Sequence, residues 1–260
     1  MTRLPTLFLS HGSPLNATAD SEASRAWATL GRTLGRPRAI LMVSAHWETS
    51  LPMLSGAHTP ETIHDFGGFP DELYRLRYDA PGSPELAQAV AATLKAGGHT
   101  AGIDGCRGLD HGAWVPLLWM YPDADVPVVQ LSVQPARGVA HHLHLGAALA
   151  GLADDDVLVI GSGHVTHNLR DWMTALRTPQ PFPYVGAFAD WIAARLEAHD
   201  TDAIVDYRRR APEAVRAHPT EEHFLPLPLA WAAAGTAPRV ERVYRGTESG
   251  ALAMDAYAFH

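Results

Sequence analysis

The chain of 260 residues contains a single cysteine, Cys106, which excludes an internal disulfide and a zinc cluster built on cysteines. Basic residues are also few, with 20 lysines and arginines against 28 aspartates and glutamates, and the formal net charge is −8. The clustered basic residues of a nucleic-acid-binding protein are missing from this sequence. No apolar run approaches about 18 residues, the length that a membrane-spanning helix needs.

Several common motifs are missing as well, namely the glycine-rich GxGxxG fingerprint, the P-loop and the GxSxG nucleophile motif. The chain reaches Pro5 and a strand-like run too early for a signal peptide. Hydrophobic residues make up 47% and charged residues 18%, which is typical of an ordinary globular protein. We expect a cytoplasmic protein with no nucleic-acid or membrane partner, either a monomer or a small homo-oligomer.

Histidine, in contrast, is abundant, with 15 residues in the chain. Three apolar, strand-like runs each end in a small residue followed by histidine: TLFLS leads to His11, AILMVSA to His46, and VLVIGSG to His164, with His167 three residues later. In an open parallel sheet, functional groups lie just beyond the carboxyl ends of the strands. With so little cysteine, a transition metal would have to be bound by imidazole and carboxylate.

Alternating strand and helix patterns predict an α/β fold, with one domain over residues 1–260 and a central, largely parallel or mixed sheet flanked by helices on both faces. The β–α–β start favours a parallel pair of strands with a right-handed crossover. Strands are predicted over 6–10, 39–44, 51–56, 126–132, 157–160, 240–245 and 251–257. Helices are predicted over 21–34, from 84 to about 96, over 140–152 and around 185–196. The polar segment 199–218 is expected at the surface, and Thr220 is expected to cap a further helix.

His11 and His46 occupy equivalent places after two strands, which favours metal ligation over simple strand-end capping. His223 is predicted in a first helical turn, where the helix dipole favours the neutral, ligating form of imidazole. It is equally compatible with a surface position. Glu221 and Glu222 beside it are alternative carboxylate ligands.

The remaining histidines are harder to assign. His164 and His167 could share a metal, or one could ligate while the other titrates, although we expect His164 to be a solvated loop residue. His111 lies in a glycine-flanked turn that suits a site loop, but loop histidines are often inert. We expect solvated positions on a polar helix face for His141, His142 and His144. These residues together predict a mononuclear, histidine-rich metal site, compatible with zinc hydrolysis or with iron and dioxygen chemistry.

Seven segments of the chain, in order, resemble the class III extradiol ring-cleavage dioxygenases, and within them the 4,5-DOPA extradiol dioxygenase branch. They are LFLSHGSP, VSAHWE, TIHDFGGFP, GLDHGAW, MYPDADVPVVQLS, GSGHVTHNLR and PTEEHFLPL. The resemblance runs from His11 almost to the C-terminal strands, but residues 170–218 carry little of it. Several motifs in register make it specific.

The resemblance implies one divalent metal held by His11, His46 and His223. The matching position of His223 is a glutamate in the related protocatechuate-type enzymes, and three neutral imidazoles suit Zn²⁺ as well as Fe²⁺. His167 matches the acid/base histidine of the family and is a candidate fourth ligand. His111 matches a second active-site histidine that contacts the substrate.

The implied reaction consumes a catechol and O₂. His167 helps to remove a proton from the catechol, and the ring opens next to the two hydroxyls rather than between them. Two alternatives remain open from the sequence. One is a zinc hydrolase on the same histidines, with Glu222 or His167 activating water, and the other is a non-catalytic binding protein on this fold.

Overall fold

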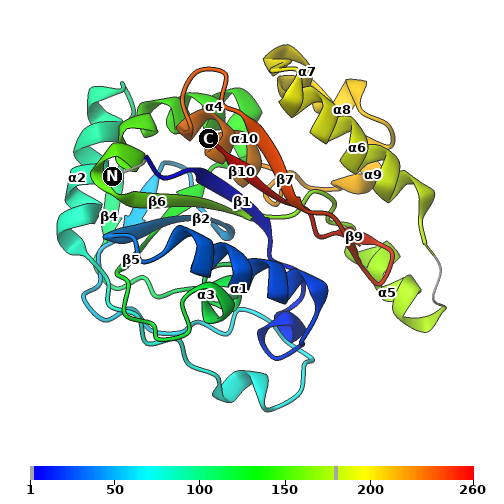
Figure 1. Ribbon diagram of the computed structural model, residues 1–260, viewed down its shortest axis with the longest axis horizontal. Coiled ribbons are helices and arrows are strands. Elements are labelled where there is room, and N and C mark those ends of the chain that lie inside the picture. The colour runs from blue at the N-terminus through cyan, green and yellow to red at the C-terminus, as the bar shows by residue number, and fades with distance from the viewer. Residues whose placement is uncertain (1–2, 179–180) are drawn as a thin grey trace.

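The structure is a computed structural model that describes residues 3–178 and 181–260. Its centre is an eight-stranded sheet with strand order β4-β3-β5-β2-β6-β1-β10-β7 (Figure 1). The strands of this sheet are β1 (Thr6–Ser10), β2 (Ala39–Glu48), β3 (Met53–Ser55), β4 (Gly102–Asp104), β5 (Val128–Val133), β6 (Val157–Gly163), β7 (Val240–Tyr244) and β10 (Ala256–Phe259). A separate hairpin pairs β8 (Thr247–Glu248) with β9 (Leu252–Ala253). The predicted α/β class is confirmed.

The four central strands, β5, β2, β6 and β1, run parallel, so their carboxyl ends meet at one edge of the sheet. Antiparallel pairs at β3–β5, β1–β10 and β10–β7 make the sheet mixed. β1 and β2 share a direction, as the β–α–β pattern predicted, but they are not neighbours. β6, which comes far later in the chain, lies between them and pairs with both.

The apolar run of β2 is buried on both faces because successive side chains of a strand point to opposite sides. Ile40 and Met42 enter the core beneath α1 (Glu22–Leu34) and α3 (His111–Met120). Leu41 and Val43 enter the core on the other face. The sheet therefore needs a helical layer on each side, and the first five residues of β2, 39–43, are all apolar.

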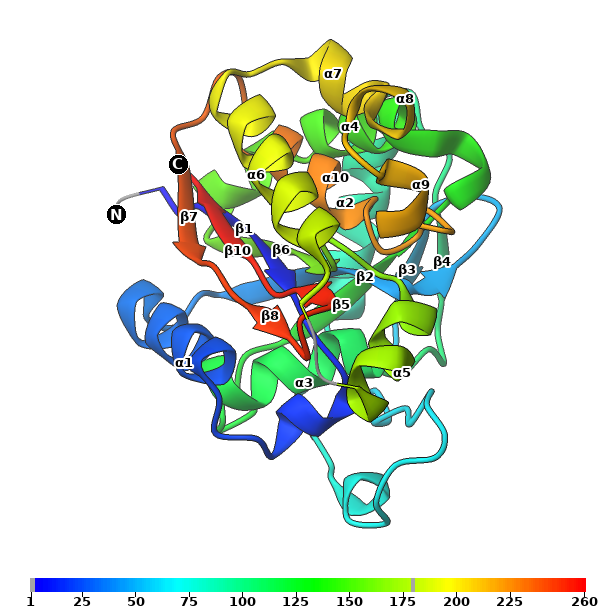
Figure 2. The same ribbon diagram turned by 90° about the vertical axis from the view of Figure 1, so that its right-hand side faces the viewer.

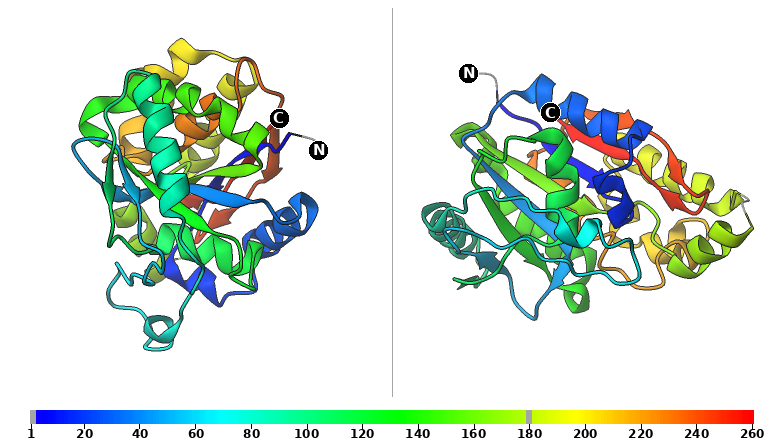
Figure 3. Two further views of the ribbon diagram at one scale, coloured as in Figure 1. Left: turned by 90° about the vertical axis from the view of Figure 1, so that its left-hand side faces the viewer. Right: turned by 90° about the horizontal axis from the view of Figure 1, so that it is seen from below.

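The second helical layer lies over the face opposite α1 and α3, as Figures 2 and 3 show. It contains α2 (Pro84–Ala96), α4 (Gly138–Ala148), α6 (Pro183–Glu197) and α10 (Pro226–Ala233). The remaining helices are α5 (Leu169–Arg177), α7 (Thr201–Val205), α8 (Tyr207–Arg210) and α9 (Ala214–Ala217). The 3-10 turns are η1 (Pro14–Ala17), η2 (Leu73–Arg75), η3 (Pro135–Arg137) and η4 (Ala150–Asp155). In the described ranges, no helix is long and apolar enough to cross a membrane.

Three predicted elements differ from the structure. Thr220 caps no helix: residues 219–225 form bends and turns, and α10 begins at Pro226. Both prolines of α10 fit because they fall in its first turn, where backbone N–H groups have no intrahelical partner. The segment 199–218 lies partly at the surface, as expected, and forms α7–α9, but it also contributes Ile204 and Tyr207, both completely buried, to the core. The predicted strand 251–257 is divided into β9 and β10.

Candidate metal centre and active site

The predicted histidines meet at the carboxyl edge of the parallel strands. His11 follows β1 directly, His46 lies near the end of β2, and His164 and His167 follow β6. β1 and β2 both pair with the end of β6, which brings His11 and His46 to the same place. His223 reaches this edge from the turn before α10, because its carbonyl accepts the His164 N–H at 2.8 Å. Gly163 is required here, since any Cβ on it would collide with that carbonyl.

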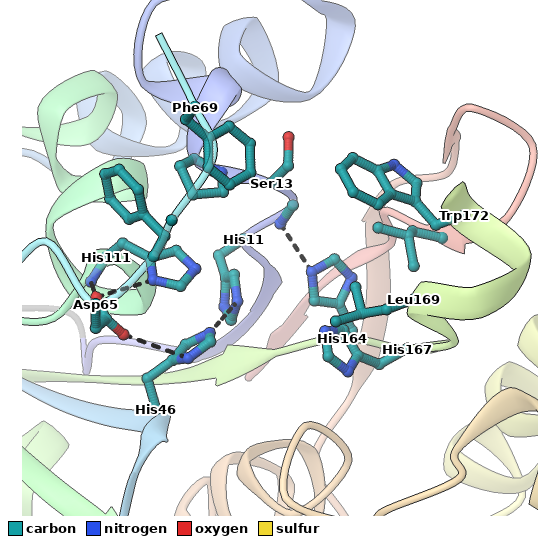
Figure 4. Close-up of a pocket in the computed structure, with 15 residues that line it drawn as sticks. His11, Ser13, His46, Asp65, Phe69, His111, His164, His167, Leu169 and Trp172 are labelled. Atoms are coloured by element: carbon teal, nitrogen blue, oxygen red, sulfur yellow. Dashed lines mark hydrogen bonds and ion pairs between the residues drawn. The ribbon is translucent and has the colours of Figure 1, made fainter. Parts of the chain in front are cut away.

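Three imidazoles converge through their Nε2 atoms. His46 Nε2 lies 3.0 Å from His11 Nε2 and 3.2 Å from His223 Nε2 (Figure 4 shows His11 and His46). The three residues form a group with the geometry to hold a metal ion. Burial lowers the pKa of His11 and His223 well below the ordinary value, and it lowers that of His46 to about 4, with a further contribution from His111. The three rings are therefore neutral at pH 7.

The tautomer of His11 follows from its hydrogen bonds. Ser162 Oγ has one proton, which it donates to the carbonyl of Gly112. Ser162 Oγ must then accept a hydrogen bond from His11 Nδ1, which lies 2.9 Å away. The proton of the His11 ring is on Nδ1, so the Nε2 lone pair faces the other two histidines.

A carboxylate faces Nδ1 of each of the other two rings and favours the same tautomer. His223 Nδ1 donates to Glu222 Oε1 at 2.8 Å, and His46 Nδ1 faces Asp65 Oδ2 at 3.4 Å. Protein metal ligands commonly have such partners on the second ring nitrogen. Three Nε2 lone pairs pointing at one another repel unless a cation lies between them. Two nitrogens about 2.1 Å from one ion are separated by roughly 3.0–3.4 Å, so the residues fit a divalent metal.

His167 lies parallel to His223, with ring centroids 3.4 Å apart and planes inclined by 12°. Its Nδ1 is 3.9 Å from Glu222 Oε1, and burial lowers its pKa well below the ordinary value. His167, Glu222 and His223 form a separate group that could also hold an ion. The predicted acid/base residue is thus adjacent to the triad, and its fourth-ligand role stays a prediction.

Asp65 is a site residue that the sequence reasoning missed. Its Oδ1 accepts hydrogen bonds from His111 Nδ1 at 3.0 Å and from the His111 backbone N–H at 2.9 Å, while its Oδ2 faces His46. Burial raises the pKa of this carboxyl, but the hydrogen bond and charge of His111 outweigh that effect and lower it to about 2. Asp65 holds His111 over His46, with ring centroids 3.9 Å apart. The available signal was an acidic residue between His64 and Phe66 in a long loop.

Two expectations about solvated histidines are wrong. His164 is 1% exposed, and its Nε2 accepts the N–H of Gly12 at 3.0 Å, which connects the turns after β1 and β6. His142 is completely buried: Nδ1 donates to the carbonyl of Gly138 and Nε2 accepts the N–H of Gln134. His144 is exposed, as expected, while His141 is partly buried.

A pocket of about 330 Å³ opens above His11 and His46 (Figure 4). Its floor is formed by five histidines, namely His11, His46, His111, His164 and His167. Its outer part, which we call the apolar wall, consists of Phe66, Phe69, Leu169, Trp172 and Leu252. Figure 4 shows Phe69 and Trp172 on opposite sides of the space above the histidines. The volume accommodates a substituted single aromatic ring.

Comparisons with known proteins agree with this geometry. Residues 5–254 match the family described as the catalytic LigB subunit of aromatic ring-opening dioxygenase. A protein of Beta vulgaris named 4,5-DOPA dioxygenase extradiol is 42% identical over 258 residues, covering 98% of this chain and 96% of that protein. A protein of the same name from Escherichia coli strain K12 is 40% identical over 261 residues, covering 97% and 93%.

A crystal structure of an uncharacterized protein from Escherichia coli K12 superposes with a TM-score of 0.82 at 34% identity, and the match covers 99% of this chain and 100% of that one. Its similarity confirms the architecture over almost the whole length. Together with the nearly full-length family match and the relatives at about 40% identity, this settles the family. The chain belongs to the LigB family of class III extradiol dioxygenases, enzymes that open aromatic rings.

Proposed function

We propose that this chain is, over residues 1–260, one catalytic domain that cleaves the ring of a DOPA-like catechol with O₂. The observation that carries the proposal is the convergence of three neutral imidazoles, each with a partner facing Nδ1, two of which, His11 and His46, line a pocket of ring size. The names of the relatives support the substrate class, since they are described as 4,5-DOPA dioxygenases.

In this proposal, His11, His46 and His223 hold one divalent ion through Nε2. Fe²⁺ is the ion expected for dioxygenase activity, and Zn²⁺ also suits three imidazoles. When bound, the ion would supply Lewis acidity that favours ionisation of the catechol and would couple the catechol electronically to O₂. The other steps belong to the side chains around the pocket.

His167 acts as the general base and acid. A neutral imidazole accepts a proton, and burial keeps this ring neutral. The proton it takes comes from a catechol hydroxyl, and it is returned as the ring opens. Stacking on His223 and the nearby Glu222 restrict its orientation.

His111 contacts the substrate from the opposite side of the floor. Its ring stands edge-on to His11, with centroids 5.3 Å apart, and Asp65 fixes its Nδ1 as a donor. The Nε2 atom is then available as an acceptor for a catechol hydroxyl. The apolar wall above excludes water from the reacting atoms.

The test is anaerobic reconstitution with Fe²⁺, followed by exposure to catechols in air. We expect a yellow semialdehyde product and the uptake of one O₂ per catechol. His46→Ala removes a proposed ligand and should abolish both metal binding and turnover, whereas the exposed His144→Ala is a matched control that should retain them.

Other outcomes would favour the alternatives. Hydrolysis of esters or amides without O₂ by the zinc-loaded protein would favour a zinc hydrolase. Tight catechol binding without any product, in protein with iron demonstrably bound, would favour a binding protein. Either result contradicts the dioxygenase proposal.

A further inference from the structure

Thr166 lies directly before His167 and joins its loop to the β8–β9 hairpin, of which Figure 1 labels β9 and Figure 2 labels β8. The Thr166 side chain is completely buried. Its Oγ1 donates to the carbonyl of Ala251 at 3.2 Å and accepts the N–H of Ala253 at 2.8 Å. The hydroxyl therefore holds both chain neighbours of Leu252, which belongs to the apolar wall of the pocket.

The hairpin is itself held in place by further hydrogen bonds. Glu248 Oε2 accepts the N–H of Ser13 at 3.0 Å and a hydrogen bond from Asn16 Nδ2 at 2.7 Å, and both donors belong to the turn after β1. The carbonyl of Gly250 accepts the N–H of Phe182 at 3.1 Å, just before α6. The hairpin is thus a fixed element rather than a free flap, and Thr166 is bound to it.

The ring of His167 depends on its main chain for its place in the site. Among the residues that the structure describes, none forms a hydrogen bond with either ring nitrogen, since Glu222 Oε1 lies 3.9 Å from Nδ1. The backbone N–H of His167 donates to the carbonyl of Ala217 at 2.8 Å. A catalytic base is commonly oriented by a hydrogen-bonded partner. Here the stack on His223 and the anchored main chain, with Thr166 next to the ring, take that place.

We propose that Thr166 is the positioning residue for His167, and that through it the β8–β9 hairpin sets where this imidazole stands relative to the triad. The proposal rests on the proposed function, in which His167 moves the catechol proton. Thr166 does not line the pocket, so it acts through His167 and not on the substrate. A displacement of about 1 Å can cost a catalytic group about 100-fold in rate, so loss of this anchor should appear in kcat.

The first experiment exchanges the hydroxyl for a methyl group of similar size. Thr166→Val should lower kcat per bound iron by about tenfold or more and change KM less, because the proton-transfer group moves while the metal centre stays. It should also raise the solvent isotope effect on kcat, since proton transfer becomes slower relative to the other steps. Thr166→Ser keeps the hydroxyl and should restore most of kcat.

Thr6→Val is the matched control for loss of a buried hydroxyl. Thr6 lies at the start of β1, and its Oγ1 donates to the carbonyl of Ala230 at 2.6 Å. This change should lower stability without altering kcat per bound iron. If Thr166→Val does not fold, Glu248→Ala loosens the hairpin from its other end and should lower kcat and raise the isotope effect in the same way. The exposed Glu241→Ala should do neither.

A measurement without turnover separates this proposal from the one on which it depends. In the metal-free protein the rings of His167 and His223 are stacked with centroids 3.4 Å apart, so each ring shifts the NMR signals of the other's protons. Thr166→Val should reduce that shift, and Thr6→Val should not. Failure of the iron-loaded wild-type protein to cleave any catechol would overturn the proposed function, whereas an unchanged ring shift in Thr166→Val would overturn the positioning role.

Two kinetic results would also overturn the positioning role while leaving the dioxygenase intact. An equal loss of kcat in Thr166→Ser would show that the shape of the side chain, and not its hydroxyl, is decisive. An equal loss in Thr6→Val would show that general destabilisation, and not the link to the hairpin, lowers the rate.

Discussion

Ser162 offers a test of the tautomer argument at the metal centre. Its Oγ accepts from His11 Nδ1 and donates to the carbonyl of Gly112, both in a buried position. In Ser162→Ala the His11 N–H loses its acceptor. The ring then either keeps an unsatisfied buried donor, or moves its proton to Nε2, where the proton blocks the atom proposed to bind the metal.

The magnitude follows from the bonds that are lost. Each buried polar group left without a partner costs about 1–3 kcal/mol. Loss of a hydrogen bond to a metal-binding histidine lowers metal affinity by about 10–100-fold, which is about 1.4–2.7 kcal/mol. The two figures agree, so we expect Ser162→Ala to bind the metal about 10–100-fold more weakly than the wild-type protein.

The assay is a competition titration against a chelator of known affinity, together with thermal unfolding of the metal-free protein. Ser132→Ala is the matched control: Ser132 is also a buried strand serine, and its Oγ interacts with Thr49 Oγ1 and accepts the N–H of Met53, away from the histidines. Both variants should lower the stability of the metal-free protein, but only Ser162→Ala should weaken metal binding. Equal metal affinity in the two variants would refute the reasoning.

Three further predictions concern residues around the site and in the core. Asp65→Asn should lower kcat by about tenfold or more at saturating iron, because His111 loses its charged acceptor, and it should also weaken metal binding, because Asp65 faces Nδ1 of His46; kinetics with parallel metal analysis would show both effects. Gly163→Ala should destabilise the fold by about 1–3 kcal/mol in urea unfolding, because the new methyl group collides with the carbonyl of His223. Burial lowers the pKa of His142 to about 4, so its folded form resists protonation. The stability it contributes is present above pH 6.5 and is lost as pH falls toward 4. As the pH falls over that range, the free energy of unfolding of His142→Gln should therefore decrease by about 3 kcal/mol less than that of the wild-type protein.

Much of the fold could be predicted because the central strands are buried on both faces. The part of β2 that is covered on both faces, residues 39–43, is apolar at every position, and such a run is easy to distinguish from a half-exposed strand. The histidines after β1 and β2 were predictable as site residues for the same reason, since the carboxyl edge of a parallel sheet is a fixed place. That His11, His46 and His223 together hold one metal was implied only by the resemblance to the class III extradiol dioxygenases.

What the sequence did not indicate depends on contacts between distant segments. His142 looks polar in the run HHLH, but its burial is decided by the packing of α4 against the sheet and by the N–H of Gln134. Asp65 lies in a long loop whose path no periodicity defines. α5 was missed although the sequence carries signals for it: Leu169, Met173 and Leu176 recur at helical spacing, and Asn168 caps the helix by accepting the Asp171 N–H.

The position of β6 between β1 and β2 has a consequence for folding. His11 and His46 are 35 residues apart in the chain, and His46 and His223 are 177 apart. Their ring nitrogens can meet only after β6 has been inserted between the two earlier strands and the turn before α10 has docked on its end. An ion at this centre would thus bind only the protein whose sheet is fully assembled. Its binding free energy would add to the barrier against global unfolding, and partly assembled sheets would gain nothing from it.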